Sequence, residues 1–321
     1  MVSRRYLRVK TMQALFAHSM KPYESLQSAE NTLIKTISNS YTLFLWFLSI
    51  LPATAFYRSR KFEELKNKHN PTPEDLYPNT RYVDNQVIAQ IEHNDLLQRL
   101  FSTHHINWEN DMDFITNIFH IIEEMDEYKA YMSNPIPENP KDAYKEDKKL
   151  VLAIIEKVMG ENEMIRWFFG EKDPNWVDDY EESLIMCYKN VTKFKYSDGD
   201  HCKILPLYDN QDDEERFCRE LFKKTIVNDA KYEEIIESKL QHWELERVIS
   251  MDILLMKMAI CELTEFPTIP IKVTLNEYID IAKLYSSDKS KVFINGVLDR
   301  IVVDLRENEK LNKSTFDFIT K

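Results

Sequence analysis

Glycine is scarce in this chain, and this scarcity limits what the chain can fold into. Its 321 residues include only four glycines (Gly160, Gly170, Gly199 and Gly296), and no two of them lie within nine residues of each other. Loops that bind nucleotides need clustered glycines, because the backbone must approach the phosphates closely. The spacing therefore argues against a P-loop, a Rossmann fingerprint and a methyltransferase cofactor loop. Abundant Leu, Ile, Lys and Glu favour helices instead.

Charge is distributed unevenly along the chain. The net charge of −12 argues against non-specific binding of nucleic acid by the whole surface. However, the first acidic residue is Glu24, and it follows five basic residues: Arg4, Arg5, Arg8, Lys10 and Lys21. A basic amino-terminal segment on an otherwise acidic chain can direct an anionic partner to one place.

Cysteine spacing and one uncharged segment bear on localisation. The four cysteines show no CxxC spacing, which predicts free thiols in a cytoplasmic protein. The charged amino terminus predicts no secretory signal. Residues 37–57 carry no charge and have the length of a bilayer span. Because Pro52 and a Ser38–Ser40 polar stretch interrupt this segment, we predict a buried core helix and no membrane span.

The order of apolar and proline residues predicts an all-α fold without strands. Proline-containing stretches at 71–78, at 135–140 and around Pro206 are expected to link helices. Residues 245–263 are apolar on nearly every face, which predicts the central helix of a bundle. Residues 149–189 and 219–257 share a helical pattern that contains Trp176 and Trp243 respectively. Duplication and coincidence explain this pattern equally well.

Three blocks of the sequence resemble the NusB family. The first is SRRYLRVKTMQALFAHSM, residues 3–20, with its RRxxR start. The second is FCRELFKKTIVNDAKYEEII, residues 217–236, which is similar to the second helical hairpin of the family. The third spans residues 246–302 and contains PIKVTLNEYIDIAK followed by FINGVLD. The residues between Met20 and Asp212 have no counterpart in the family pattern.

The resemblance implies a fold, a domain organisation and a function. The expected fold is a pair of packed helical bundles with a large helical insertion. Residues 1–22 would form the first helix with a basic RNA-binding tip, 23–210 the insertion, and 211–321 the carboxy-terminal bundle. The implied function is a non-enzymatic transcription antitermination factor without a cofactor. It would bind boxA-type single-stranded RNA with NusE, a ribosomal small-subunit protein, in an RNA polymerase antitermination complex that supports ribosomal RNA transcription.

The resemblance also implies which residues contact RNA. Arg4 and Arg8 are four residues apart and project from one helix face, and guanidinium groups suit phosphates and base edges. Gln13, one turn later, would read a base edge or remain a solvated helix residue. Phe293 is expected on the same face as Lys291, and an exposed aromatic beside a lysine can stack on an unpaired base. Ordinary helix packing is the alternative for Phe293. The predicted RNA-binding set is Arg4, Arg5, Arg8, Lys10, Gln13, Lys291, Phe293 and Asn295.

Three further residues are expected at the interface with the protein partner. Phe16 aligns with an aromatic that the family uses near its ribosomal-protein partner, although a core position is the simpler interpretation. Asp252 lies in an otherwise apolar helix, where an unpaired carboxylate is costly to bury. The family has an acidic residue there that faces NusE, so we predict an interface role for Asp252 and not a catalytic one. Lys289 replaces a frequently acidic family residue, which implies a compensating charge on the partner.

Other functional classes have less support from the sequence. The pairs His104–His105 and His201–Cys202 are adjacent and do not share a helix face, so no metal site is predicted. No Ser/His/Asp or Cys/His arrangement is apparent, so no catalytic residue is predicted. Some RNA cytosine methyltransferases carry a NusB-like domain, but they need the glycine-rich cofactor turns that this chain lacks. The remaining alternative is a protein-only helical scaffold in a transcription or ribosome-assembly complex.

Overall fold

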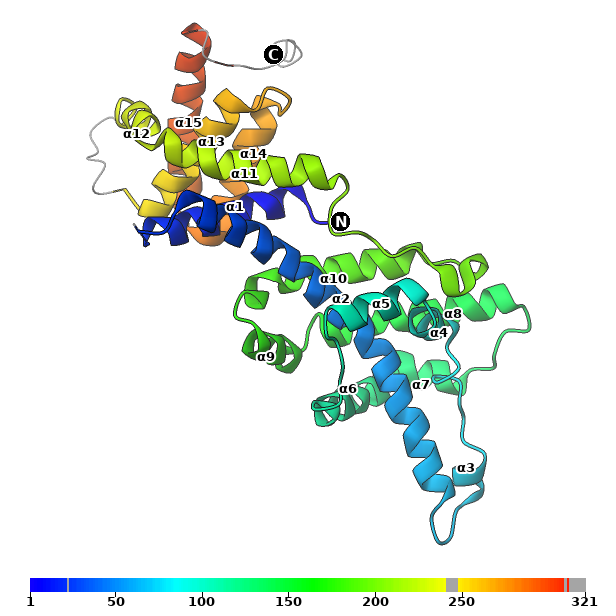
Figure 1. The fold of residues 1–321 in the computed structure, drawn as a ribbon. Coiled ribbons are helices and arrows are strands. Elements are labelled where there is room, and N and C mark those ends of the chain that lie inside the picture. Colours follow the sequence, from blue (N-terminus) through cyan, green and yellow to red (C-terminus); the bar gives the residue numbers. More distant parts are fainter. Residues whose placement is uncertain (22, 241–247, 309–310, 312–321) are drawn as a thin grey trace. The chain divides into compact units, whose positions relative to one another are not determined.

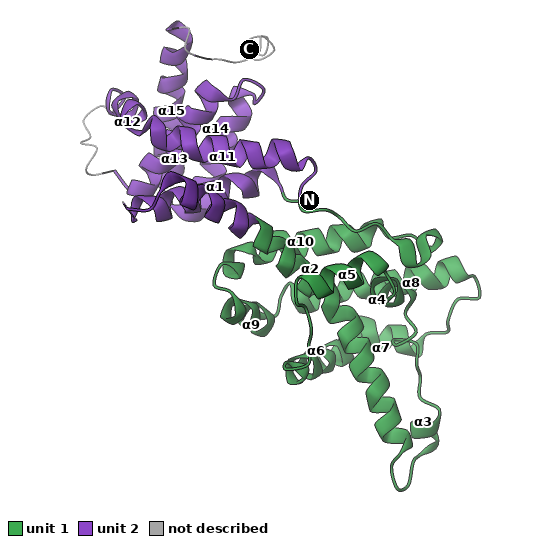
Figure 2. Cartoon of the chain, in the orientation of Figure 1, with its two compact units in different colours: residues 1–2, 38–207 green, residues 3–37, 208–321 purple. Residues whose placement is uncertain are grey.

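The computed structural model describes residues 1–21, 23–240, 248–308 and 311. Within these ranges every regular element is a helix, and no strand is present, which confirms the predicted all-α class (Figure 1). The chain divides into two compact units (Figure 2). Unit 1 comprises Met1–Val2 and Ser38–Leu207, and unit 2 comprises Ser3–Ile37 and Tyr208–Lys321.

The helix α2 (Leu26–Lys66) contributes to both units, and this differs from the domain boundary expected after residue 22. Leu33 and Ile37 are fully buried. In the same unit, the Arg219 Nη1 atom lies 3.4 Å from Glu30 Oε1. Residues 23–37 therefore belong to the unit that contains the amino-terminal helix. A continuous helix carries no local sequence signal where its packing partners change.

Unit 2 is a bundle arranged around one central helix. Helix α13 (Ser250–Glu265) contacts every other full helix of the unit, and ten of its sixteen residues are buried, which confirms its predicted central position. The expected residues 245–247 of this helix and Trp243 lie outside the described residues. The surrounding helices are α1 (Arg4–Ser19), α11 (Gln211–Val227), α12 (Asp229–Glu237), α14 (Ile271–Tyr285) and α15 (Ser290–Glu307).

Unit 1 packs around the apolar middle of α2. Residues Leu43–Leu51 are buried, as predicted for a core helix. In the described part of the chain, α2 alone is long and apolar enough to cross a membrane, and 67% of its apolar window is buried. The other helices of unit 1 are α3 (Pro73–Leu76), α4 (Gln86–Glu92), α5 (Asp95–Thr103), α6 (Met112–Glu124), α7 (Asp126–Ser133), α8 (Pro140–Ala153), the π-helix η1 (Ile154–Met159), α9 (Glu163–Lys172), α10 (Trp176–Lys193) and the 3-10 helix η2 (Tyr196–His201).

Local sequence explains where many of these helices begin. The side chains of Asn85, Asn94, Asn139 and Asn162 each accept a hydrogen bond from a backbone amide in the first turn of α4, α5, α8 and α9. Such caps satisfy amides that have no partner within the helix. The three predicted proline-containing linkers fall between helices, apart from the four-residue α3 and the first residue of α8.

Candidate functional site

The predicted basic residues of α1 lie partly at the surface and partly in the interior of unit 2. Its cap is Ser3, whose hydroxyl accepts from the Tyr6 amide at 3.1 Å. Arg4 and Arg5 are exposed, whereas Arg8 and Lys10 are buried. The guanidinium carbons of Arg4 and Arg8 lie 4.8 and 5.4 Å from the centre of the Phe217 ring on α11. The two arginines share a helix face, as expected, and on that face Arg8 is buried while Arg4 remains exposed.

Arg8 forms a buried ion pair with Glu262 of α13. Its Nε and Nη2 atoms each donate to one carboxylate oxygen at 2.8 Å, and the two side chains are 2% and 0% exposed. Thr274 and Tyr278 of α14 donate to the same carboxylate at 2.8 and 3.3 Å. Burial lowers the pKa of Arg8, but the hydrogen bonds and charge of Glu262 outweigh that effect and raise the pKa above its ordinary value. The network links α1, α13 and α14.

The fold buries two of the predicted RNA contacts, Arg8 and Lys10. Arg8 is held inside the bundle by Glu262, and its side chain is 2% exposed. Lys10 is 3% exposed, and its ammonium group lies 5.7 Å from the centre of the Tyr6 ring. Helix α1 packs against α11, α13 and α14. Gln13 is half-buried on the same helix.

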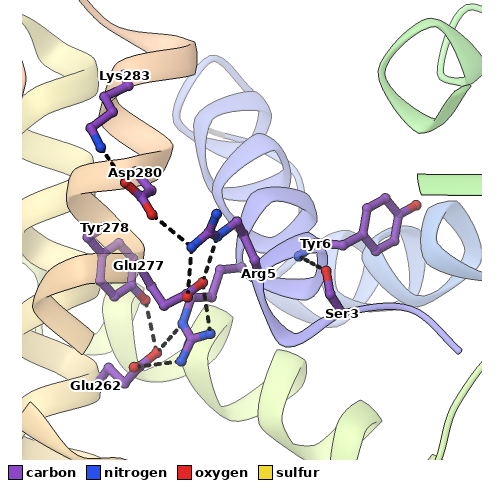
Figure 3. A network of polar contacts seen from close by, with 9 residues as sticks. Ser3, Arg5, Tyr6, Glu262, Glu277, Tyr278, Asp280 and Lys283 are labelled. Atoms are coloured by element: carbon purple, nitrogen blue, oxygen red, sulfur yellow. Dashed lines mark hydrogen bonds and ion pairs between the residues drawn. The ribbon is translucent and has the colours of Figure 1, made fainter. Parts of the chain in front are cut away.

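Arg5 is the basic residue that best combines exposure with a defined position. Its side chain is 45% exposed and points towards Glu277 and Asp280 on α14 (Figure 3). Its Nε and Nη2 atoms donate to Glu277 at 3.0 Å, and Nη2 also donates to Asp280 at 2.8 Å. The hydrogen bond from Lys283, followed by the charge of Arg5, lowers the pKa of Asp280. Two carboxylates therefore hold one exposed arginine.

A pocket of about 590 Å³ opens between the start of α13 and the start of α15. Asp252 lines this pocket but is only 3% exposed, and it accepts hydrogen bonds from the hydroxyls of Ser286 and Ser290. The expectation that its carboxylate needs a partner is met within the chain, by serines 34 and 38 residues away. The carboxylate of Asp252 is therefore paired and buried inside the unit.

The same pocket brings together residues that were predicted to serve different functions. Lys289, expected at the protein interface, and Phe293, expected to stack on RNA, both line it. Ile249 and Val292, also lining residues, are 46% and 69% exposed. The resulting surface is largely apolar and also includes the adjacent charged residues Asp288 and Lys289.

The remaining predicted residues are distributed along two helices. Lys291 is exposed near the start of α15, and Asn295 is exposed and donates to Asp299 at 3.0 Å. Ile294 and Leu298 of α15 are fully buried. Phe16 is 37% exposed on α1, so it is a surface residue and not a core one.

The residues predicted from the sequence did not include the three carboxylates that bind Arg5 and Arg8, namely Glu262, Glu277 and Asp280. Glu262 carried a usable signal, because a second carboxylate in the apolar helix α13 required a buried partner as much as Asp252 did. Glu277 and Asp280 lie on the half-exposed face of α14 and carried no such signal. In the described ranges, no group of three or more His, Cys, Asp or Glu residues could hold a metal ion.

Comparison with known proteins connects the carboxy-terminal part of the chain to one family. A family model described as the NusB family matches residues 196–303. A transcription antitermination protein NusB from Salinibacter ruber is 34% identical over 142 residues, which cover 43% of this chain and 86% of that protein. A protein of the same name from Listeria welshimeri is 36% identical over 91 residues, covering 28% of this chain and 71% of the relative. No solved structure matches the chain.

Proposed function

This chain belongs to the NusB family, and from that premise we propose that it is a transcription antitermination factor that binds boxA-type single-stranded RNA together with NusE. In this proposal the protein acts in the cytoplasm, within an RNA polymerase antitermination complex that supports ribosomal RNA transcription. It contributes binding surfaces and no catalytic step. The observation that carries the proposal is the pair of exposed arginines, Arg4 and Arg5, at the start of α1.

Arg4 and Arg5 supply the proposed RNA contacts. Guanidinium groups bind phosphate through two parallel hydrogen bonds. Arg5 already uses this geometry towards Glu277, so a phosphate can take the place of that carboxylate without a change of side-chain chemistry. Lys291 and Asn295 remain candidates for a second part of the RNA surface, since both are exposed near the start of α15.

The affinity for RNA is expected to increase when the two carboxylates that hold Arg5 are neutralised. The double variant Glu277→Gln, Asp280→Asn removes the charges that compete with phosphate. Because exposed ion pairs contribute about 0.2–1 kcal/mol each, we expect boxA RNA to bind about two- to tenfold more tightly. Titration of labelled boxA RNA at several salt concentrations measures this change.

A matched control separates this competition from a general change of charge. Glu234→Gln, Glu237→Gln also removes two negative charges, at exposed residues of α12. We expect this variant to bind RNA almost as the wild type does. Equal gains in both variants would show that Glu277 and Asp280 do not mask Arg5 specifically.

The pocket beside Asp252 supplies the proposed NusE surface. Its exposed apolar margin is typical of a protein interface, whereas RNA phosphates offer nothing to Val292 or Ile249. Lys289 lies at the margin and suits an acidic residue of the partner. Asp252 acts indirectly in this proposal, because its bonds to Ser286 and Ser290 shape the wall of the pocket.

Introducing a charge into this pocket is expected to weaken NusE binding. Val292→Asp places a carboxylate on the apolar margin, where desolvation on binding has no compensating partner. We expect NusE to bind at least about tenfold more weakly by calorimetry, because truncated or disrupted interface anchors typically cost more than 1 kcal/mol. Val303→Asp is the matched control, since Val303 is exposed on α15 and does not line the pocket. Unchanged NusE binding by Val292→Asp would refute the pocket as the interface.

A titration of boxA RNA with and without NusE tests the proposal as a whole. We expect NusE to increase the RNA affinity through a coupling of about 1–3 kcal/mol, because two exposed arginines provide few contacts alone. NusE binding without any salt-dependent binding of RNA would instead favour a protein-only helical scaffold.

A further inference from the structure

Unit 1 contains an open groove whose floor is rigid and apolar. The groove has a volume of about 590 Å³ and lies between the middle of α2, the end of α5 and the segment that leads into α6. Trp108 is 8% exposed in its floor, donates to Ser49 at 3.0 Å, and packs edge-to-face on Trp46 with ring centres 4.7 Å apart. These contacts fix the indole ring, so the floor is formed before anything binds.

One face of α2 forms a wall of the groove and is left partly uncovered. Pro52 and Ala53 line the groove together with Phe56, which lies four and three residues after them, one turn further along α2. Pro52 and Ala53 are half-buried, and Phe56 is 52% exposed, although the preceding turns of α2 are buried on all sides. An aromatic side chain exposed beside a preformed apolar floor is typical of a surface that receives an apolar anchor.

The charges around the groove indicate the chemistry of its occupant. Glu92 and Glu109 line it, and neither side chain has an ion-pair partner in the part of the chain that the structure describes. Arg60 is the single basic residue of the lining. Residues 38–207 contain 29 acidic and 19 basic residues, so the surrounding unit is also acidic.

We propose that this groove docks a basic amphipathic segment of another protein. Apolar side chains of the segment would lie on Trp108 and against Phe56, while its lysine or arginine residues would meet Glu92 and Glu109. Helical segments bind apolar grooves in this way, through anchors spaced one turn apart. The proposal concerns unit 1 alone and does not depend on RNA binding by unit 2.

The test uses the full chain and a defined probe. The probe is a fluorescein-labelled amphipathic helical peptide of leucine and lysine, and its binding is followed by fluorescence anisotropy. We expect Glu92→Gln, Glu109→Gln to weaken binding about fivefold, as two exposed ion pairs would. Phe56→Ser should weaken binding about tenfold by removing an apolar anchor. The glutamate variant should also bind with a smaller salt dependence, whereas Phe56→Ser should leave the salt dependence unchanged.

Two controls distinguish docking from non-specific attraction to an acidic protein. Glu138→Gln, Glu161→Gln removes the same charge at exposed residues outside the groove and is expected to leave binding unchanged. A benzophenone group on the apolar face of the peptide should crosslink to residues of the groove, identified by mass spectrometry. Equal weakening by both glutamate pairs, crosslinks outside the groove, or tighter binding of a leucine–glutamate peptide would overturn the proposal.

Discussion

Glu262→Gln is expected to lower the free energy of unfolding of unit 2 by about 3–5 kcal/mol. Removing one partner of a buried ion pair leaves the other charge without compensation in a medium of low polarity. Arg8 would be that charge, since its two donors at 2.8 Å both bind Glu262 and its side chain is 2% exposed, which leaves only the longer contact of its Nη1 with Glu277 at 3.6 Å. Thr274 and Tyr278 would also lose the charge of their acceptor. This is the largest change in stability that we expect from a single substitution.

The measurement needs a readout that is specific for unit 2. Urea unfolding followed by circular dichroism reports on the whole chain, and a chain of two units need not unfold in one step. Hydrogen–deuterium exchange of peptides from α13 and α14 therefore complements it. Glu265→Gln is the control on the same helix, because Glu265 pairs with Lys224 at the surface at 3.3 Å. We expect that variant to lose no more than about 1 kcal/mol, and equal losses in both variants would contradict the role of the buried pair.

Arg4→Gln, Arg5→Gln is expected to weaken boxA RNA binding by about tenfold for each arginine that contacts phosphate. A charge-assisted hydrogen bond contributes about 1.5–3 kcal/mol, and about 1.4 kcal/mol corresponds to a factor of ten. The fall of log affinity with log salt should also become shallower, by about 0.7 for each lost contact with a single strand. The fold should survive, since the ion pairs of Arg5 are exposed.

A control variant with the same net charge as Arg4→Gln, Arg5→Gln tests whether the position of the lost charges matters. Lys223→Gln, Lys272→Gln also removes two exposed positive charges from unit 2, on α11 and α14. We expect it to bind RNA nearly as the wild type does, with an almost unchanged salt dependence. If a folded Arg4→Gln, Arg5→Gln variant kept the wild-type affinity and salt dependence, the RNA site would have to lie around Lys291, or the function would be protein-only scaffolding.

The sequence by itself determined the helical class, the core segments and the family. Helix periodicity depends on neighbours three and four residues apart, so the central position of α13 and the burial of Leu43–Leu51 were both predictable. The scarcity of glycine argued against nucleotide-binding functions, because nucleotide-binding loops are local structures that a short stretch of sequence reveals. The block at residues 246–302 carried the family resemblance without any knowledge of the fold.

The tertiary structure alone decided which charged residues remain available for binding. The spacing of Arg4 and Arg8 predicted one shared face, but only packing revealed that Glu262, 254 residues away, encloses Arg8. Asp252 shows the same limit, because its serine partners are separated from it by a whole helix. A buried charge must be compensated, and the compensating residue is chosen by proximity in space. Sequence distance contains no information about that proximity.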